Sequence, residues 1–324
     1  MYSESTCWAA FRFHKVDMPY LLEQLGLADG SPGSTDGMWH TPNRCCFAPM
    51  EALVCLLGRL SYPNTWGQRA QLLGGRHPSA YSQMFIVVLQ YLYDRFYPHV
   101  FEIGRFSSDA LDFAAAIHAH GQLIENCIGF IDGTFRHCCR PKDDQRVIYS
   151  GYYKGHGFKF QSVVCPNGLL CDFWGPHCGR RADGHMFRAS GFEARMQQLS
   201  QKVGKIMCVY GDPAYCRGKY VSKGYLGACT PEQARWTGRM NSIRETVEWG
   251  FMLVVRDWAF IDYKKNLRLG LQPISMMYIV AVLLTNVKSC MMAEKYDGFG
   301  NEIANKFRVA PPSVHMYLYP DDDE

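Results

Sequence analysis

The chain has 324 residues, of which 48% are hydrophobic and 20% are charged. This composition is typical of a globular protein that buries a full core in one large domain or two smaller ones, and it excludes a chain built from low-complexity sequence. The formal net charge of +4 permits a nucleic-acid partner but does not require one. Charge alone therefore identifies no partner.

Helical periodicity dominates the sequence before residue 125. The apolar spacing predicts helices over residues 49–60 and 66–73, and a longer helix over residues 80–96. A short helix, a glycine turn and a second helix are the outline of a helix-turn-helix, although a plain helical bundle fits the same pattern. In the first case the DNA contacts would come from Arg76, His77, Ser79, Tyr81, Ser82 and Gln83.

Strand patterns replace the helical ones after residue 125. In chain order the sequence predicts strands over residues 127–131, 158–165 and 169–174, a helix over 184–203, a strand over 206–210 and a helix over 242–260. Pro166-Asn167-Gly168 separates the second and third strands and is typical of a hairpin turn. This order matches a ribonuclease H-like mixed α/β sheet with flanking helices, preceded by the helical region.

These patterns predict three parts of the chain. Residues 1–125 form the helical region with its possible helix-turn-helix, residues 126–290 form the ribonuclease H-like domain, and residues 291–324 form a C-terminal tail. The most apolar late stretch, Ile274–Val287, is too short and too interrupted by polar residues to span a bilayer, so we expect a buried helix and no membrane association.

The cysteines favour a reduced intracellular chain with buried thiols. There are 14 of them, either isolated or in adjacent pairs such as Cys45-Cys46, and no C-x-x-C spacing occurs. A zinc site or a disulfide framework is therefore not predicted.

Two of the predicted strands end on an aspartate. Asp132 follows the first strand, and Asp212 follows the strand over residues 206–210 between a glycine and a proline. In the predicted arrangement these two strands are neighbours, so the carboxylates would meet and a cation such as Mg²⁺ would relieve their repulsion. A third acid from a nearby helix would allow two ions to bind side by side, as in phosphodiester cleavage.

The helix predicted over residues 242–260 offers Glu245 and Glu248 as that third acid. Its apolar stripe places Glu248 roughly 80° from the buried face, and Glu245 roughly 140° away. Glu248 is therefore expected to reach the site, whereas Glu245 is expected to point to water.

The chain resembles the DDE-superfamily endonucleases of PIF/Harbinger-type DNA transposases. The resemblance covers roughly residues 45 to 290. Its motifs are Phe130-Ile131-Asp132-Gly133-Thr134, Tyr210-Gly211-Asp212-Pro213-Ala214-Tyr215, Arg244-Glu245-Thr246-Val247-Glu248-Trp249-Gly250-Phe251 and the helical segment Arg59-Leu60-Ser61-Tyr62-Pro63-Asn64. It is the order and spacing of these motifs, more than any one of them, that is specific.

The resemblance implies a metal-dependent nuclease that hydrolyses DNA at transposon ends and joins the freed 3′-hydroxyl to target DNA. It makes Asp132 and Asp212 metal ligands and Glu248 the third acid, with Mg²⁺ or Mn²⁺ as the ion. It also implies a nuclear location and a separate Myb-like DNA-binding protein as partner, and a homo-oligomer is compatible with it. The alternative is a domesticated transposase that binds DNA or chromatin without cutting it.

Further residues are candidates for auxiliary roles. Asp183 precedes a helix and is predicted as its N-cap rather than as a catalytic group. Arg244 lies one turn before Glu248, where it would steer that carboxylate, hold a phosphate or form a surface ion pair. The candidate DNA contacts near the predicted strands are Arg136, Arg140, Lys154, Lys159, Arg180 and Arg181.

Overall fold

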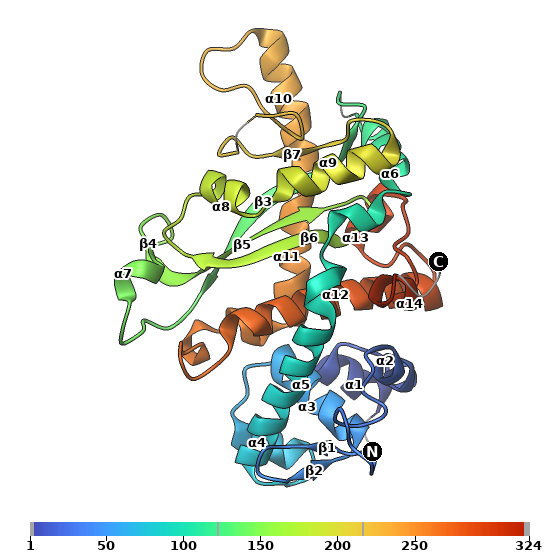
Figure 1. The fold of residues 1–324 in the computed structure, drawn as a ribbon, viewed down its shortest axis with the longest axis vertical. Helices are drawn as coiled ribbons and strands as arrows, with labels where there is room; N and C mark the ends of the chain where they lie inside the picture. The colour runs from blue at the N-terminus through green and yellow to red at the C-terminus, as the bar shows by residue number, and fades with distance from the viewer. Residues whose placement is uncertain (1–2, 122, 216, 321–324) are drawn as a thin grey trace. The chain divides into compact units, whose positions relative to one another are not determined.

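The computed structural model of the chain describes residues 3–121, 123–215 and 217–320 (Figure 1). It contains two compact units, each built from two stretches of the chain. The first comprises Met1–Pro98 and Val254–Leu284, and the second comprises His99–Leu253 and Thr285–Glu324. The functional division predicted at residues 125 and 290 stays a prediction, and the acidic residues 321–324 of the predicted tail lie outside the described residues.

The first unit is mainly helical. Its elements are α1 (Glu4–Phe11), η1 (Lys15–Asp17), α2 (Met18–Gln24), β1 (Trp39–His40), β2 (Cys46–Phe47), α3 (Pro49–Ser61), α4 (Trp66–Leu72), most of α5 (Pro78–Val100), η3 (Ala259–Asp262) and η4 (Lys264–Asn266). The three helices predicted in this region are present, and α5 extends beyond the predicted bounds at both ends.

Arg59 is buried in the first unit and joins its two stretches of chain. Its guanidinium carbon lies 3.8 Å from the Phe260 ring centre and 4.5 Å from that of Trp66. One guanidinium nitrogen also donates to the carbonyl of Asn64. Burial lowers the pKa of Arg59 to about 10. Arg59, the first residue of the motif Arg59–Asn64, thus has a packing role here.

The tip between α4 and α5 uses two of the predicted DNA contacts for packing. Tyr81 is buried, and its hydroxyl donates to the carbonyl of Leu73 at 2.7 Å. Arg76 donates to Glu51 Oε2 at 2.9 Å and covers the ring of Phe47. The prediction of Tyr81 as a DNA contact is wrong, because the turn of the helix that carries it faces the core.

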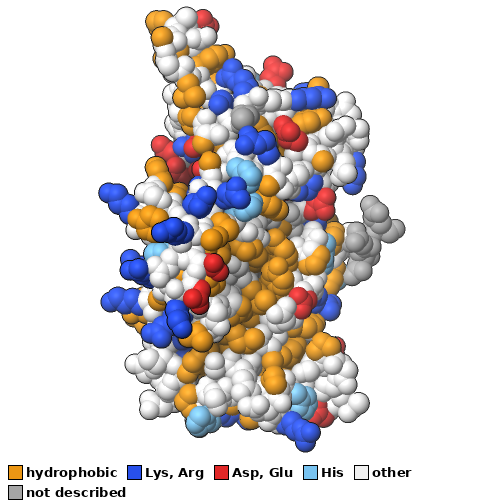
Figure 2. All heavy atoms as spheres, turned by 60° about the vertical axis from the view of Figure 1, so that its left-hand side comes forward, with side chains coloured by type: hydrophobic (Ala, Val, Ile, Leu, Met, Phe, Trp, Pro, Cys, Tyr) orange, Lys and Arg blue, Asp and Glu red, His pale blue; other side chains and the backbone are white. Residues whose placement is uncertain are grey.

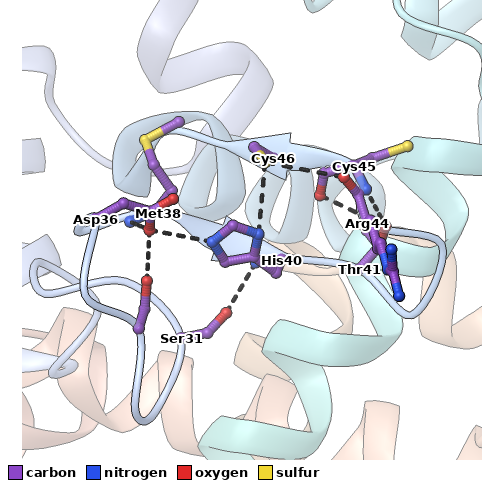
Figure 3. Close-up of polar contacts among 9 residues, drawn as sticks. Ser31, Asp36, Met38, His40, Thr41, Arg44, Cys45 and Cys46 are labelled. Atoms are coloured by element: carbon purple, nitrogen blue, oxygen red, sulfur yellow. Dashed lines mark hydrogen bonds and ion pairs between the residues drawn. The ribbon is translucent and has the colours of Figure 1, made fainter.

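A network of polar contacts holds the loop that leads into the β1–β2 ribbon (Figure 3). Asp36 Oδ1 accepts hydrogen bonds from the Ser34 hydroxyl at 2.5 Å and from the Met38 N–H at 3.0 Å, and it lies 3.0 Å from His40 Nε2. The other ring nitrogen of His40 lies 3.4 Å from Cys46 Sγ on the paired strand. These contacts fix an exposed loop that has little apolar surface to bury.

The second unit is built on a mixed sheet. Its strands are β3 (Cys127–His137), β4 (Tyr149–Ser150), β5 (Gly155–Val164), β6 (Leu170–Cys178), β7 (Cys208–Gly211) and β8 (Val221–Lys223). The order is β4-β5-β3-β7-β8, and β6 also pairs with β5. β3 runs antiparallel to β5 and parallel to β7, which confirms the predicted ribonuclease H-like sheet. The short strands β4 and β8 were not predicted.

The predicted hairpin between β5 and β6 is confirmed. Gly168 at its tip has a φ of +76°, a conformation that favours glycine. Asn286 accepts from the Leu170 N–H at 3.1 Å and donates to the Leu170 carbonyl at 3.1 Å. Asn301 donates to the Gly168 carbonyl at 2.9 Å. Segments distant in the chain thereby fix the hairpin.

Helices flank this sheet in the second unit (Figure 1). They are η2 (Ile103–Phe106), α6 (Ala110–Ala119), α7 (Gln145–Ile148), α8 (Asp183–Ala189), α9 (Phe192–Val203), α10 (Pro231–Arg244), α11 (Thr246–Asp257), α13 (Glu302–Phe307) and α14 (Val314–Leu318). The last four residues of α11 belong to the first unit.

Two predicted helices are each divided in the structure. The helix predicted over residues 184–203 is α8 and α9, because Gly191, with a φ of +67°, interrupts it. The helix predicted over residues 242–260 is α10 and α11, which meet at Glu245. α10 starts earlier than predicted, because Thr230 caps it, Gln233 completes a capping box and Pro231 opens its first turn.

The apolar helix predicted over residues 274–287 is α12 (Ile274–Lys295). It is long and apolar enough to cross a membrane by length and composition, but 83% of its most apolar window is buried in the protein. The prediction of a buried core helix is confirmed. The cysteines among the described residues are free, and most of them are buried.

Candidate active site

Asp132 and Asp212 lie at neighbouring positions because their strands are parallel partners. In the register of β3 and β7, Phe130 pairs with Tyr210 and Ile131 pairs with Gly211. Asp132 is the next residue of β3, which continues to His137 instead of ending at residue 131 as predicted, and Asp212 is the first residue after β7. β7 ends at Gly211, where an added Cβ would lie only 2.9 Å from Ile131 Cγ2. The missing side chain of this glycine lets β3 and β7 approach closely just before Asp132 and Asp212.

A cleft of about 700 Å³ opens beside these two aspartates. Its charged lining consists of four acids, three long basic side chains and a histidine. They are Asp132, Asp183, Asp212, Glu248, Lys159, Arg188, Arg244 and His185. The cleft lies wholly within the second unit.

Asp132 is largely buried, with 19% of its side chain exposed. Burial raises the pKa of Asp132 to about 6, and the nearby carboxylates of Asp212 and Asp183 act in the same direction. The Gly133 N–H, which donates to Asp132 Oδ1 at 2.8 Å, and the Arg244 guanidinium oppose the rise. Asp132 therefore carries its negative charge under a desolvation cost that a bound cation would offset.

Arg244 connects two of the predicted site acids. Its Nη1 donates to Asp132 Oδ2 at 3.2 Å, and its Nη2 lies 3.7 Å from Glu248 Oε1. Glu248 is 60% exposed and lines the cleft from the first turn of α11. The predicted contact of Arg244 with Glu248 is present. Arg244 also contacts Asp132, whose side chain is more buried than that of Glu248.

Glu245 occupies the junction between α10 and α11. It is exposed, as predicted, and does not line the cleft. Its backbone keeps helical dihedral angles, so α11 continues the direction of α10 with one irregular residue between them (Figure 1). The junction leaves Arg244 and Glu248 on the cleft side.

Asp183 faces the cleft, and its predicted role as an N-cap is wrong. The N-cap of α8 is Ala182, and Asp183 is the first helical residue. Its Oδ1 accepts a hydrogen bond from Lys159 Nζ at 2.7 Å. Lys159 is only 10% exposed, so its charge requires this partner. The ion pair decides the orientation of the carboxylate in place of capping.

The predicted DNA contacts lie in different environments. Arg136 is buried and donates to the Thr134 hydroxyl at 2.5 Å. Arg140 is exposed and donates to Gln145 Oε1 at 2.8 Å. Lys154, Arg180 and Arg181 are exposed on loops that border the strands. Lys159 and Arg136 thus serve the interior of the unit, whereas the other four reach solvent.

Sequence reasoning missed several residues that line or support the cleft. His185 and Arg188 line it from α8, and Tyr152 and Tyr153 line it from the loop before β5. Tyr215, which was named as part of the motif around Asp212, is buried and packs edge-on against Phe187, and its hydroxyl has no hydrogen-bond partner among the described residues. The sequence signal for the two α8 residues and the two loop tyrosines was their position next to Asp183 and Lys154.

The donor set suits a hard divalent cation. The cleft offers carboxylate oxygens, the ligands that Mg²⁺ and Mn²⁺ prefer. As the side chains stand, the described residues contain no cluster of three or more His, Cys, Asp or Glu that encloses a metal. Arg244 accounts for part of this, because its positive charge lies against both Asp132 and Glu248. An ion held by these acids would replace that charge.

The family comparison covers the part of the chain that contains the cleft. Residues 105–286 match the model of a DDE superfamily endonuclease. The chain belongs to the DDE superfamily of endonucleases. No curated protein and no solved structure matches the chain. The part of this DDE endonuclease that matches contains all four acids of the cleft and Arg244. Enzymes of the superfamily generally use divalent metal ions and act as nucleases or transposases on DNA.

Proposed function

We propose that this protein is a metal-dependent DNA endonuclease of the PIF/Harbinger type. It cleaves phosphodiester bonds at transposon ends and joins the freed 3′-hydroxyl to target DNA. One observation carries the proposal. Asp132, within β3, and Asp212, directly after the parallel strand β7, share a cleft with Glu248, in a chain of the DDE endonuclease superfamily.

The acids of the cleft would hold the ion, and Arg244 would influence the charge and the position of these acids. Asp132, Asp212 and Glu248 are the proposed ligands of Mg²⁺ or Mn²⁺. The bound ion would supply Lewis-acid stabilisation of the phosphate and lower the pKa of an attacking water. Arg244 balances two of the ligands while no ion is present. Its guanidinium also suits a phosphate oxygen once an ion takes over the carboxylates.

Lys159 and Asp183 form a fixed wall of the cleft. Because Lys159 is already paired at 2.7 Å, it adds little free positive charge for DNA. The pair instead holds the Asp183 carboxylate close to Gly133, the residue after Asp132. We assign this pair a positioning role rather than direct chemistry.

The wider assignments rest on the resemblance of the motifs. They are DNA as the substrate, a Myb-like DNA-binding protein as partner, a nuclear location and a homo-oligomer. Fluorescent tagging in cells would test the location, and co-expression with a Myb-like candidate would test the partner.

Cleavage of supercoiled plasmid by the purified protein in Mg²⁺ or Mn²⁺ tests the proposal. We expect Asp132→Ala, Asp212→Ala and Glu248→Ala each to reduce nicking at least about a thousandfold, because each removes an ion ligand. Glu245→Ala is the matched control, since this exposed acid lies three residues before Glu248 and outside the cleft. Its nicking rate should equal that of the wild type.

The other outcomes have distinct meanings. Nicking that survives all three substitutions would show that the site is misassigned. A wild-type protein that binds DNA but never cuts, with or without partner, would favour the domesticated, non-cleaving DNA-binding protein.

A further inference from the structure

The chain between Asp212 and Arg244 leaves the cleft and returns to it. Asp212 and Ala214 line the cleft where β7 ends, and Arg244 lines it where α10 ends. The described residues between them, 213–215 and 217–243, which we call the basic arm, include β8 and α10. In Figure 1 α10 extends past the sheet at the top of the view. Both ends of the basic arm are thus fixed at the candidate active site.

The basic arm concentrates positive charge. It contains five basic residues and a single acid, Glu232, and the basic residues are Arg217, Lys219, Lys223, Arg235 and Arg239. The resulting charge equals the +4 of the whole chain, so the remaining residues are close to neutral overall. Figure 2 shows Lys and Arg side chains gathered below the projecting tip at the top of the view.

The five charges differ from the basic residues of the cleft in their surroundings. Among the described residues no ion pair involves any of the five, in contrast to Lys159 and Arg244 in the cleft. Arg235 and Arg239 are both exposed and lie four residues apart, so they share one face of α10. Arg217 and Lys223 donate to the carbonyls of Lys223 and Pro213 and thereby brace the loop. Arg235 and Arg239 therefore remain available to a ligand.

Aromatic packing fixes the basic arm to the strand that carries Asp212. Trp236 packs against Tyr225 at 5.4 Å and against Tyr210 of β7 at 6.1 Å between ring centres. The Tyr210 hydroxyl lies 3.0 Å from Asn241 Oδ1. The Thr230 cap holds the start of α10. The positions of Arg235 and Arg239 are consequently set relative to the cleft.

We propose that the basic arm binds the phosphate backbone of the duplex that leads into the cleft, with Arg235 and Arg239 as phosphate contacts. The 14 residues of α10 span about 21 Å, the length of about six base pairs. Arginine binds phosphate oxygens through paired N–H donors. The link to the cleft rests on the proposed function, but binding of the duplex by the basic arm requires no metal ion and no cleavage.

The test is the salt dependence of binding to a labelled 30-base-pair duplex in EDTA, followed by fluorescence anisotropy. Arg235→Gln/Arg239→Gln should lower the slope of log affinity against log[KCl] by about 2, and weaken binding at least about tenfold at 0.1 M KCl. Arg235→Lys/Arg239→Lys keeps the charge and should keep the slope. Lys202→Gln/Lys205→Gln removes the same charge at the end of α9 and should also keep it.

An unchanged slope in Arg235→Gln/Arg239→Gln would overturn the proposal, as would an equal loss in Lys202→Gln/Lys205→Gln. Thermal melts check that each variant stays folded. The plasmid assay separates the two proposals. If the wild type never nicks but the slope falls in Arg235→Gln/Arg239→Gln, DNA binding by the basic arm is supported and the nuclease proposal is contradicted. If the wild type nicks and the slope is unchanged, the basic arm alone fails.

Discussion

Asp36 in the first unit and Asp132 in the second both accept a backbone N–H, yet their surroundings change the acidity of the two carboxyls in opposite directions. Hydrogen bonds from the Ser34 hydroxyl, the His40 ring and the Met38 N–H hold the pKa of Asp36 well below its usual range. Burial raises the pKa of Asp132 to about 6. Hydrogen bonds from the protein stabilise the negative charge of Asp36, whereas burial disfavours the negative charge of Asp132.

This difference in acidity suits Asp36 to a structural role and Asp132 to binding a cation. Asp36 is exposed, and its donors come from its own loop, so ionisation strengthens the local fold. Asp132 is buried near other acids, and the Arg244 guanidinium and the Gly133 N–H favour its charge. A group that is ionised at a cost in the folded protein gains most from a bound cation.

The largest expected effect is on stability through Asp132. Its folded pKa of about 6 lies above the 3.8 of the unfolded carboxyl, so the stability it contributes is present below about pH 4 and is lost as the pH rises through 6. Asp132→Asn removes this titration. In EDTA at pH 7.5 we expect the variant to exceed the wild type in unfolding free energy by at most about 3 kcal/mol.

Urea unfolding of both proteins at pH 7.5 and pH 4 measures this difference. The gap should largely close at pH 4. Added Mg²⁺ should narrow the gap at pH 7.5 by stabilising the wild type alone. Equal stability of the two proteins at pH 7.5 would contradict the desolvated state of Asp132.

The packing that supports the site gives the next effect. In Gly133→Ala the new Cβ would lie 2.9 Å from Asp183 Oδ1, which Lys159 holds in place. We expect this variant to lose about 1 to 3 kcal/mol of unfolding free energy. Gly238→Ala is the control, because a Cβ there meets open space on α10 and should stabilise by up to about 1 kcal/mol. If Gly133→Ala has the same unfolding free energy as the wild type, Asp183 does not pack tightly against Gly133.

A smaller effect is expected from Arg244→Gln. The guanidinium lowers the pKa of Asp132, so its removal should move that pKa above 6. Carbon-13 NMR of the Asp132 carboxyl, assigned with Asp132→Asn, measures the change directly. Arg239→Gln is the control on the same helix and should leave the titration unchanged. A fall in the Asp132 pKa in Arg244→Gln would refute the contact.

The smallest effect is expected at Asp36, because this carboxylate is exposed. Its lowered pKa means that its stabilising contribution is present above the unfolded pKa of 3.8 and is lost as the pH falls below it. Asp36→Asn should therefore lower the unfolding free energy at pH 7.5, opposite in sign to Asp132→Asn. The two substitutions can be compared in the same urea titrations. If Asp36→Asn were more stable than the wild type, the two carboxylates would not differ in the sign of their effect on stability.

The features predicted correctly are those encoded by short stretches of sequence. The apolar runs before Asp132 and Asp212 mark buried strands, and Pro166-Asn167-Gly168 marks the hairpin, so the sheet and the meeting of the two acids follow from local pattern and known topology. Glu248 was distinguished from Glu245 by helical periodicity alone, and the cleft lining agrees with that choice.

The remaining features depend on contacts between distant residues. The ion pair of Lys159 with Asp183 and the burial of Arg136 are set by how β5, β3 and α8 pack, which no local pattern records. The junction at Glu245 was missed because its backbone stays helical on both sides. The basic arm was missed because its five charges are spread over residues 217–239 and meet only when β8 and α10 fold.

Binding of Mn²⁺, followed by the loss of its free electron paramagnetic resonance signal, tests the central claim most directly. The account predicts that the wild type and Glu245→Gln bind Mn²⁺, whereas Asp132→Asn, Asp212→Asn and Glu248→Gln lose most of that binding. Equal Mn²⁺ binding by all five proteins, or none by the wild type, would contradict the assignment of this cleft as a metal-dependent active site.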